Sequence, residues 1–162
     1  MEQVKKYELT TDSKDYFGHK LYRIRALISF GIVVKGELGG WVESEKNASH
    51  SGDAWVSGNA RVYGDAWVYG DAWVSGNAWV SGNAKIEISA DYFTAGPIGS
   101  RSGFITFTRS NMSVATGCFY GTIATFTAAV KKTHGTNEHA KNYLALVKMV
   151  KSMWKQDGKA AK

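Results

Sequence analysis

The residues from Gly52 to Glu87 read GDAWVS, GNARVY, GDAWVY, GDAWVS, GNAWVS and GNAKIE, which are six consecutive hexapeptides. Alanine occupies the third position of every hexapeptide, and valine or isoleucine occupies the fifth. Alternation along a strand places these two side chains on one face, and Gly followed by Asp or Asn favours a sharp turn. A short strand and a turn every six residues, with no helix between them, is typical of a hexapeptide β-helix.

Three hexapeptides make one triangular coil, so the run predicts two coils stacked about 4.8 Å apart. We expect alanine and valine to fill the interior, and Leu38, Gly40 and Val42 to continue the same period before the run. Two coils need capped ends. We therefore predict a mainly β chain with an N-terminal β cap in residues 1–35, a hexapeptide β-helix in 36–88 and a C-terminal α+β module in 89–162.

The flanking segments carry their own secondary-structure signals. Alternating residues predict strands at 7–9, 20–27, 104–108 and 113–116, the first two joined through the turn-rich stretch 11–18. Thr122 is expected to cap a helix that ends at Gly135. A second helix is expected from about Asn137 to Gln156, with an apolar stripe along one side.

Composition limits the class of protein. The chain has 162 residues, of which 44% are hydrophobic and 21% charged, and no apolar stretch approaches the length that spans a bilayer. The N-terminus lacks the apolar core of a secretory signal, and the single cysteine, Cys118, fits a reducing compartment. We therefore expect a cytoplasmic protein that makes no use of a membrane.

The charge is concentrated near the C-terminus. From Lys131 onward there are eight lysines against Glu138 and Asp157, and this difference of +6 equals the net charge of the whole chain. Such a balance admits an anionic partner. We interpret the lysines of the final helix as a solvated face rather than as a site of direct nucleic-acid binding, which stays the alternative for that helix.

The outward position between alanine and valine is aromatic or basic in every repeat. In order it holds Trp55, Arg61, Trp67, Trp73, Trp79 and Lys85. Residues 18 apart should stack, which pairs Trp55 with Trp73, Arg61 with Trp79 and Trp67 with Lys85. So much exposed aromatic surface requires a cover. The cover is a second protomer packed side by side, the chain's own flanking segments, or a ligand with flat rings that stacks on Trp beside Arg or Lys.

A glycine-rich segment from Gly96 to Gly103 forms a second candidate site. Its glycines allow close approach of the backbone, its serines donate hydrogen bonds, and Arg101 can hold a phosphate or carboxylate with two hydrogen bonds. It lacks the Gly-Lys-Ser/Thr ending of a P-loop. The alternative is a plain connection into the strand that follows.

No catalytic constellation stands out. Cys118 precedes a helix N-terminus, where the pKa of a thiol falls, and His134 and His139 are candidate bases, but a buried structural cysteine is the favoured interpretation. Hexapeptide acyltransferases use a base histidine, and hexapeptide carbonic anhydrases bind zinc through three histidines. The repeats contain no histidine. We expect no catalytic residue, metal ion or cofactor, and keep an acyltransferase-like enzyme as the lesser alternative.

The run from Lys20 to Leu27, the stretch from Gly39 to Glu45 and the hexapeptides together resemble small phage and prophage proteins of the hexapeptide-repeat type. The segments Gly96 to Arg101 and Gly117 to Thr122 and the pair His134-Gly135 resemble the C-terminal module attached to such proteins. The resemblance implies a left-handed β-helix. It also implies an accessory role, because several small phage families sequester nucleotide second messengers of host immunity without cleaving them.

We accordingly expect a non-enzymatic homo-oligomer, a trimer, that acts in the host bacterial cytoplasm. It would sequester a small phosphate-bearing nucleotide-derived ligand and counter host antiviral defence. The alternative is an interaction or assembly protein that docks a host defence protein through its Trp-rich faces. The expected ligand-binding residues come from the glycine-rich segment and the repeats, and they are Arg101, Ser100, Gly99, Ser102, Trp73, Trp79, Arg61 and Lys85.

Overall fold

The protein, seen in a computed structural model that describes residues 4–117 and 119–156, divides into two compact units, Met1–Asp91 and Tyr92–Lys162. Each unit has its own buried core. Cys118, considered above as a nucleophile or a buried thiol, lies outside the described residues.

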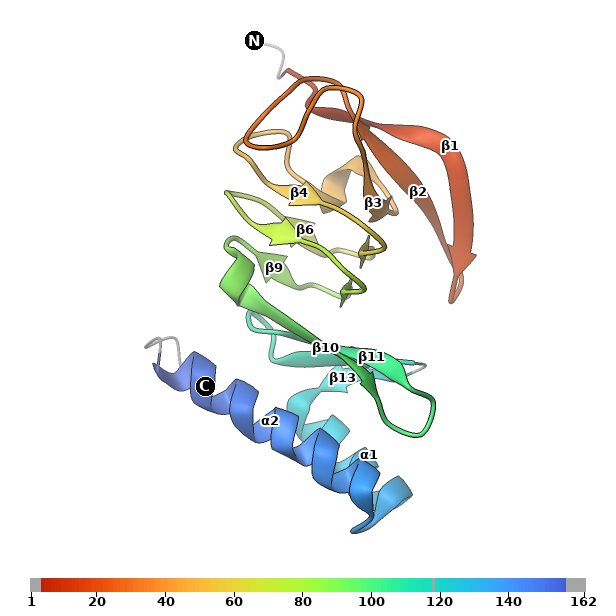
Figure 1. Ribbon diagram of the computed structural model, residues 1–162, viewed down its shortest axis with the longest axis vertical. Helices are drawn as coiled ribbons and strands as arrows, with labels where there is room; N and C mark the ends of the chain where they lie inside the picture. The colour runs from red at the N-terminus through yellow and green to blue at the C-terminus, as the bar shows by residue number, and fades with distance from the viewer. Residues whose placement is uncertain (1–3, 118, 157–162) are drawn as a thin grey trace. The chain divides into compact units, whose positions relative to one another are not determined.

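The N-terminal unit begins with a hairpin of β1 (Tyr7–Tyr16) and β2 (His19–Ala26) (Figure 1). Phe17 and Gly18 form its two-residue turn, with φ of 48° and 83°. Two positive φ values suit the right-handed twist of the strands. The stretch expected to be turn-rich is therefore mostly strand. β2 also pairs antiparallel with β3 (Leu38–Val42), which leads into the repeats.

Each hexapeptide contributes a two-residue strand. These strands are β4 (Trp55–Val56), β5 (Arg61–Val62), β6 (Trp67–Val68), β7 (Trp73–Val74), β8 (Trp79–Val80) and β9 (Lys85–Ile86). The first glycine of every repeat has φ between 62° and 68°. A Cβ atom at Gly52 would lie 2.6 Å from the carbonyl oxygen of Gly70, so this turn also needs glycine for close approach. The repeat alanines, valines and isoleucine are buried, as predicted.

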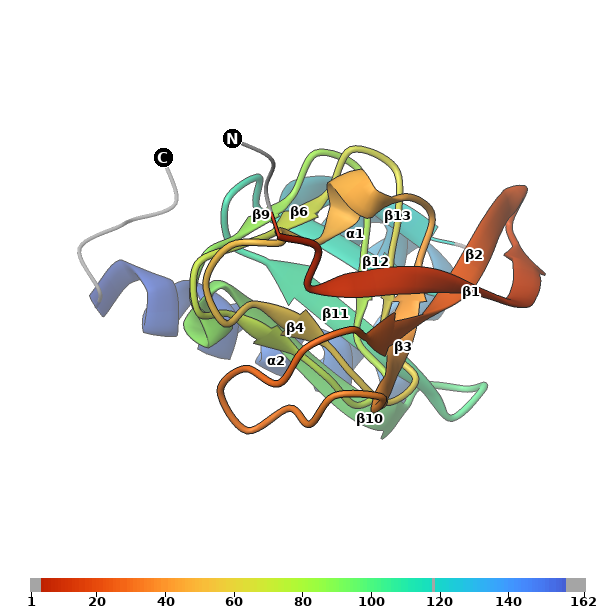
Figure 2. The ribbon, with the colours of Figure 1, turned by 90° about the horizontal axis from the view of Figure 1, so that it is seen from above.

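The strands pair in parallel with partners 18 residues away. β4 pairs with β7, β5 with β8 and β6 with β9, so the residue pairs expected from the repeat length are confirmed. Figure 2 looks down on the repeats and shows β4 and β6 on different sides of the stacked turns. Before the run the offset is 20 residues, because Val42 pairs with Val62 and Ala48 with Val68. The continuation of the six-residue period through Val42 is therefore displaced by two residues.

The expected fold class, a mainly β protein built on a left-handed β-helix, is wrong. Strands make up 39% of the structure and helices 24%. The strands form several small separate sheets, and the described residues form no closed or solenoid sheet. Two coils of two-residue strands make sheets of only two strands, β4-β7 and β6-β9. The third pair joins the antiparallel strands in one mixed sheet of order β1-β2-β3-β5-β8. The C-terminal unit differs again, because its sheet packs against two helices.

The C-terminal unit is an antiparallel sheet packed against two helices (Figure 1). Its strands in order are β10 (Tyr92–Ile98), β11 (Gly103–Thr108), β12 (Ser113–Thr116) and β13 (Phe119–Thr122). The helices are α1 (Ile123–His134) and α2 (Glu138–Gln156). Thr122 caps α1 by accepting a hydrogen bond from the amide of Thr125, and Gly135 ends it, as predicted. Short 3-10 turns, η1 (Glu45–Asn47) and η2 (Ser89–Asp91), lie at either end of the repeats.

Candidate ligand-binding site

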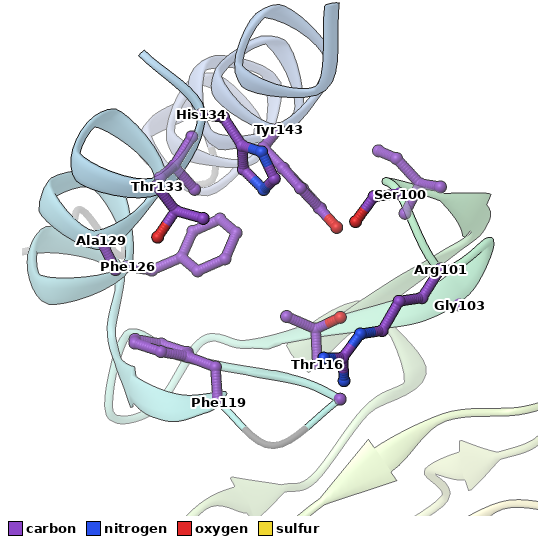
Figure 3. Close-up of a pocket in the computed structure, with 13 residues that line it drawn as sticks. Ser100, Arg101, Gly103, Thr116, Phe119, Phe126, Ala129, Thr133, His134 and Tyr143 are labelled. Carbon is purple, nitrogen blue, oxygen red and sulfur yellow. The ribbon is translucent and has the colours of Figure 1, made fainter.

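A pocket of about 290 Å³ opens in the C-terminal unit between the sheet and the two helices (Figure 3). It is formed where the β10–β11 loop, the strands β12 and β13, and the helices α1 and α2 come together. Its lining residues are Ile98, Ser100, Arg101, Gly103, Thr116, Gly117, Phe119, Phe126, Ala129, Val130, Thr133, His134 and Tyr143.

One end of the pocket is apolar. Phe126 belongs to the buried face of α1, and its ring lies 5.3 Å from that of Phe119 and 5.5 Å from that of Tyr143. Both contacts are edge-to-face, the preferred geometry for such pairs. Ala129 and Val130 extend this surface along α1. Phe126 itself is only 3% exposed, so the partly buried rings of Phe119 and Tyr143 supply most of the aromatic surface that a flat apolar group could contact.

The opposite end is polar and is supplied by the β10–β11 loop. Ser100 and Arg101 lie across the pocket from the phenylalanine rings in Figure 3. The hydroxyls of Ser100 and Tyr143 point toward one another there, and the Arg101 side chain reaches toward Thr116. A hydroxyl and a guanidinium at one end provide donors for an oxyanion.

Gly99 and Ser102 shape this loop. The amide of Ser102 donates to the carbonyl oxygen of Gly99 at 3.1 Å, and Gly99 has φ of 80°. A Cβ atom at Gly99 would lie 1.9 Å from the hydroxyl of Tyr143. The glycine is therefore needed for both its backbone conformation and its contact with α2.

The polar groups of the pocket favour an anion. Among the described lining residues, Arg101 and His134 are the basic ones, and neither aspartate nor glutamate is present. Burial raises the pKa of Tyr143, so its hydroxyl stays protonated at neutral pH and can donate a hydrogen bond. A cationic end facing an apolar end suits a ligand with a ring and a phosphate.

Two of the expected ligand residues lie instead beneath the β1–β2 hairpin. Trp79 is 7% exposed, and the ring of Phe17 stacks on it at 5.4 Å while Tyr16 meets it edge-on at 5.1 Å. The guanidinium of Arg61 lies over the Tyr16 ring at 4.3 Å and donates to its hydroxyl at 3.2 Å. The N-terminal hairpin thus occupies the surface that these two side chains would offer a ligand.

The other two lie on separate faces of the repeats. Trp73 is partly buried beside Trp55, which is fully buried, while Lys85 is exposed beside Trp67, which is 40% exposed. Arg61, Trp73, Trp79 and Lys85 therefore do not share one face. Arg101 and Ser100 are the expected residues that the pocket brings together, with Gly99 and Ser102 in the same loop.

Sequence reasoning missed the apolar half of the pocket. Phe126, Val130 and Tyr143 lie on the two predicted helices, where apolar side chains are expected to face the core, and all three belong to or pack against the core of this unit. Phe119 follows Cys118 in a segment whose candidate chemistry was assigned to the cysteine alone. A signal was present in the aromatic rings that flank the glycine-rich segment along the chain, but only the fold shows which of them converge.

No protein-family model matches the chain, and neither does any curated protein. Within residues 4–117 and 119–156, no helix has the length and apolar character needed to cross a membrane. Histidine, cysteine, aspartate and glutamate side chains do not gather in groups of three that could hold a metal ion anywhere in the described part of the chain.

Proposed function

We propose that the protein binds a small phosphate-bearing, nucleotide-derived ligand in the pocket of its C-terminal unit and holds it without chemical change. The observation that carries this proposal is the pocket itself, which joins Arg101 and Ser100 at one end to aromatic rings at the other. Aromatic rings recognise a base through its face, and arginine recognises a phosphate through its planar fork.

Under this proposal the protein acts by sequestration in the host bacterial cytoplasm, where removal of a nucleotide signal counters antiviral defence. The supporting features are the cationic lining described above and the resemblance of the sequence to phage accessory proteins. Binding alone suffices for this role, because a captured signal no longer reaches its receptor.

The test is a thermal-unfolding screen against mononucleotides, dinucleotides, cyclic oligonucleotides and cyclic ADP-ribose isomers. A ligand at about 100 times its dissociation constant adds about 2.7 kcal/mol to the stability of the state that binds it. The bound ligand is then released by denaturation and identified by chromatography. Recovery of the intact ligand supports sequestration, whereas a cleaved product or silence across the panel contradicts it.

Arg101→Ala should weaken binding of any ligand found in that screen. A hydrogen bond to a charged group contributes about 1.5–3 kcal/mol, so the dissociation constant should rise about tenfold to hundredfold. Arg101 is exposed, so the variant should keep the stability of the native chain. Isothermal titration calorimetry gives both values.

The matched control is Arg25→Ala. This arginine is also exposed, but it belongs to β2 of the N-terminal unit, where its guanidinium lies 3.5 Å from Glu8. The control removes the same charge and should leave affinity unchanged. Equal losses in the two variants would show that net charge, rather than the pocket, governs binding.

A further inference from the structure

The proposed function leaves open how many nucleotides the ligand contains, and the following inference rests on that function. We propose that the pocket takes a single nucleoside monophosphate, with its base at the Phe119–Phe126 end and its phosphate at the Ser100–Arg101 loop.

The size of the pocket supports one nucleotide. Its volume of about 290 Å³ is at the lower limit of the roughly 300–1,000 Å³ found for pockets that enclose drug-sized ligands. A second linked nucleotide would extend past the rim into solvent, where the described lining residues offer it no contact. Cyclic dinucleotides therefore gain little from the pocket over a single nucleotide.

The orientation follows from the two ends. The rings of Phe119, Phe126 and Tyr143 surround the apolar end, and the ring of His134 lies 6.0 Å from that of Tyr143 at an interplanar angle of 33°. A base in this position contacts the aromatic rings, and the imidazole of His134 can form a hydrogen bond with the polar atoms of the base. The phosphate then reaches Arg101, because the guanidinium offers a charged fork of donors, whereas the phenylalanine end offers a phosphate only the Thr133 hydroxyl and the His134 imidazole among the described lining residues.

The helix α1 offers a way to separate the two ends by mutation. Ala129 lines the apolar end and is partly buried, whereas its neighbour Ala128 is exposed on the same helix. Leucine is a good helix former, so either position accepts it without cost to the helix. Ala129→Leu therefore fills the base end while Arg101 and Ser100 stay in place, and Ala128→Leu is the matched control.

The experiment measures dissociation constants of AMP, UMP, adenosine, inorganic phosphate and cyclic di-AMP for the native chain and three variants. At least one monophosphate should bind ten times or more tightly than adenosine, phosphate and cyclic di-AMP. Ala129→Leu should weaken that monophosphate at least tenfold while its affinity for inorganic phosphate is unchanged. Arg101→Ala should weaken both, and Ala128→Leu neither.

The outcomes distinguish this inference from the function on which it rests. Tighter binding of cyclic di-AMP than of either monophosphate would overturn the single-nucleotide inference and leave the proposed function standing. Equal monophosphate affinities in Ala129→Leu and Ala128→Leu would overturn the placement of the base. Absence of binding by every probe here and by every ligand of the wider screen would overturn both.

Discussion

Lys6 is a buried charged residue in the N-terminal unit. Its ammonium group donates to the carbonyl oxygens of Gly52 and Ala54 at 3.3 and 2.5 Å and lies 4.6 Å from the centre of the Phe30 ring. It thereby satisfies two carbonyl groups of the first repeat. Burial lowers the pKa of Lys6 from 10.5 to about 8, although the nearby Asp53 acts in the opposite direction.

This shift predicts that stability rises with pH between about 8 and 10. In that window the unfolded chain keeps the Lys6 proton and the folded chain has released it, so raising the pH favours the fold by on the order of 2 kcal/mol. Above pH 10 the trend should reverse, because burial raises the pKa of Tyr7 and raises that of Tyr63 to about 12. Urea unfolding at a series of pH values measures the curve.

Lys6→Met is the diagnostic variant for this rise. It should flatten the curve between pH 8 and 10, since methionine does not titrate. Lys5→Met is the control, because Lys5 is exposed and pairs with Glu45 at the surface. A rise that persists in Lys6→Met would assign the effect to another group, of which Lys14, whose pKa burial also lowers, is the first to examine.

Gly99 should tolerate no side chain. Alanine there would combine a positive φ with a Cβ atom 1.9 Å from the Tyr143 hydroxyl, so Gly99→Ala should destabilise the C-terminal unit by about 2 kcal/mol or more. Gly103→Ala is the control, because no heavy atom lies within 4 Å of the position its Cβ would take. Thermal unfolding compares the two, and equal midpoints would show that the loop moves freely away from α2.

At the scale of elements, the β1–β2 hairpin is held by side chains over part of its length. Its backbone pairing to β3 reaches from Arg25 only as far as Tyr22, and the segment from Thr10 to Leu21 contacts the repeats through rings and charges instead. Trp79 is the centre of these contacts. This is how the chain covers an aromatic surface that it would otherwise expose.

Trp79→Ala should therefore cost far more than the same change at Trp67, which occupies the same position of another repeat. Loss of a buried tryptophan destabilises by about 3–5 kcal/mol, whereas the change at the 40%-exposed Trp67 should cost about 1 kcal/mol. Hydrogen exchange of the segment 10–21 should accelerate only in Trp79→Ala. Unchanged exchange there would mean that the hairpin is held by contacts other than those with Trp79.

The transition from β3 into the repeats depends on one buried amide. The Asn47 side chain accepts from the amides of Glu43 and Ser44 and donates to the carbonyl oxygens of Gly64 and Ala66. It links the irregular first turn to the regular repeats, where the pairing offset changes from 20 to 18 residues. Periodicity alone does not reveal such an insertion, because residues 43–51, between Val42 and the first hexapeptide, do not read as a repeat.

At the scale of the whole molecule, the N-terminal region covers the outward aromatic residues of the repeats unevenly. Trp55 and Trp79 are buried by the chain's own hairpin and β2–β3 loop, so a second protomer is not needed to cover them. Trp67 keeps an exposed face and stacks on Tyr69 at 4.0 Å. Assembly into a trimer stays a prediction, and its interface would have to use what the hairpin leaves uncovered.

The two units also differ in how much of their structure the sequence patterns predicted. Six repeats of identical length determined where the short strands and turns lie, but the fold class depended on sheet partners that a six-residue period does not specify. In the C-terminal unit, the capping residues placed α1 correctly, and the apolar stripe placed α2 correctly. They did not show that Phe119, Phe126 and Tyr143 would meet the Ser100–Arg101 loop around one pocket.

By itself the sequence determined the local features of this protein: the glycine turns, the 18-residue pairing, the buried alanines and valines, and the start and end of α1. These depend on backbone sterics and on side-chain alternation between neighbours in the chain. The tertiary structure alone decided that the hairpin covers Arg61 and Trp79 and that Arg101 faces a ring of aromatic residues. Those outcomes depend on packing between segments far apart in sequence, where many arrangements satisfy the same local pattern.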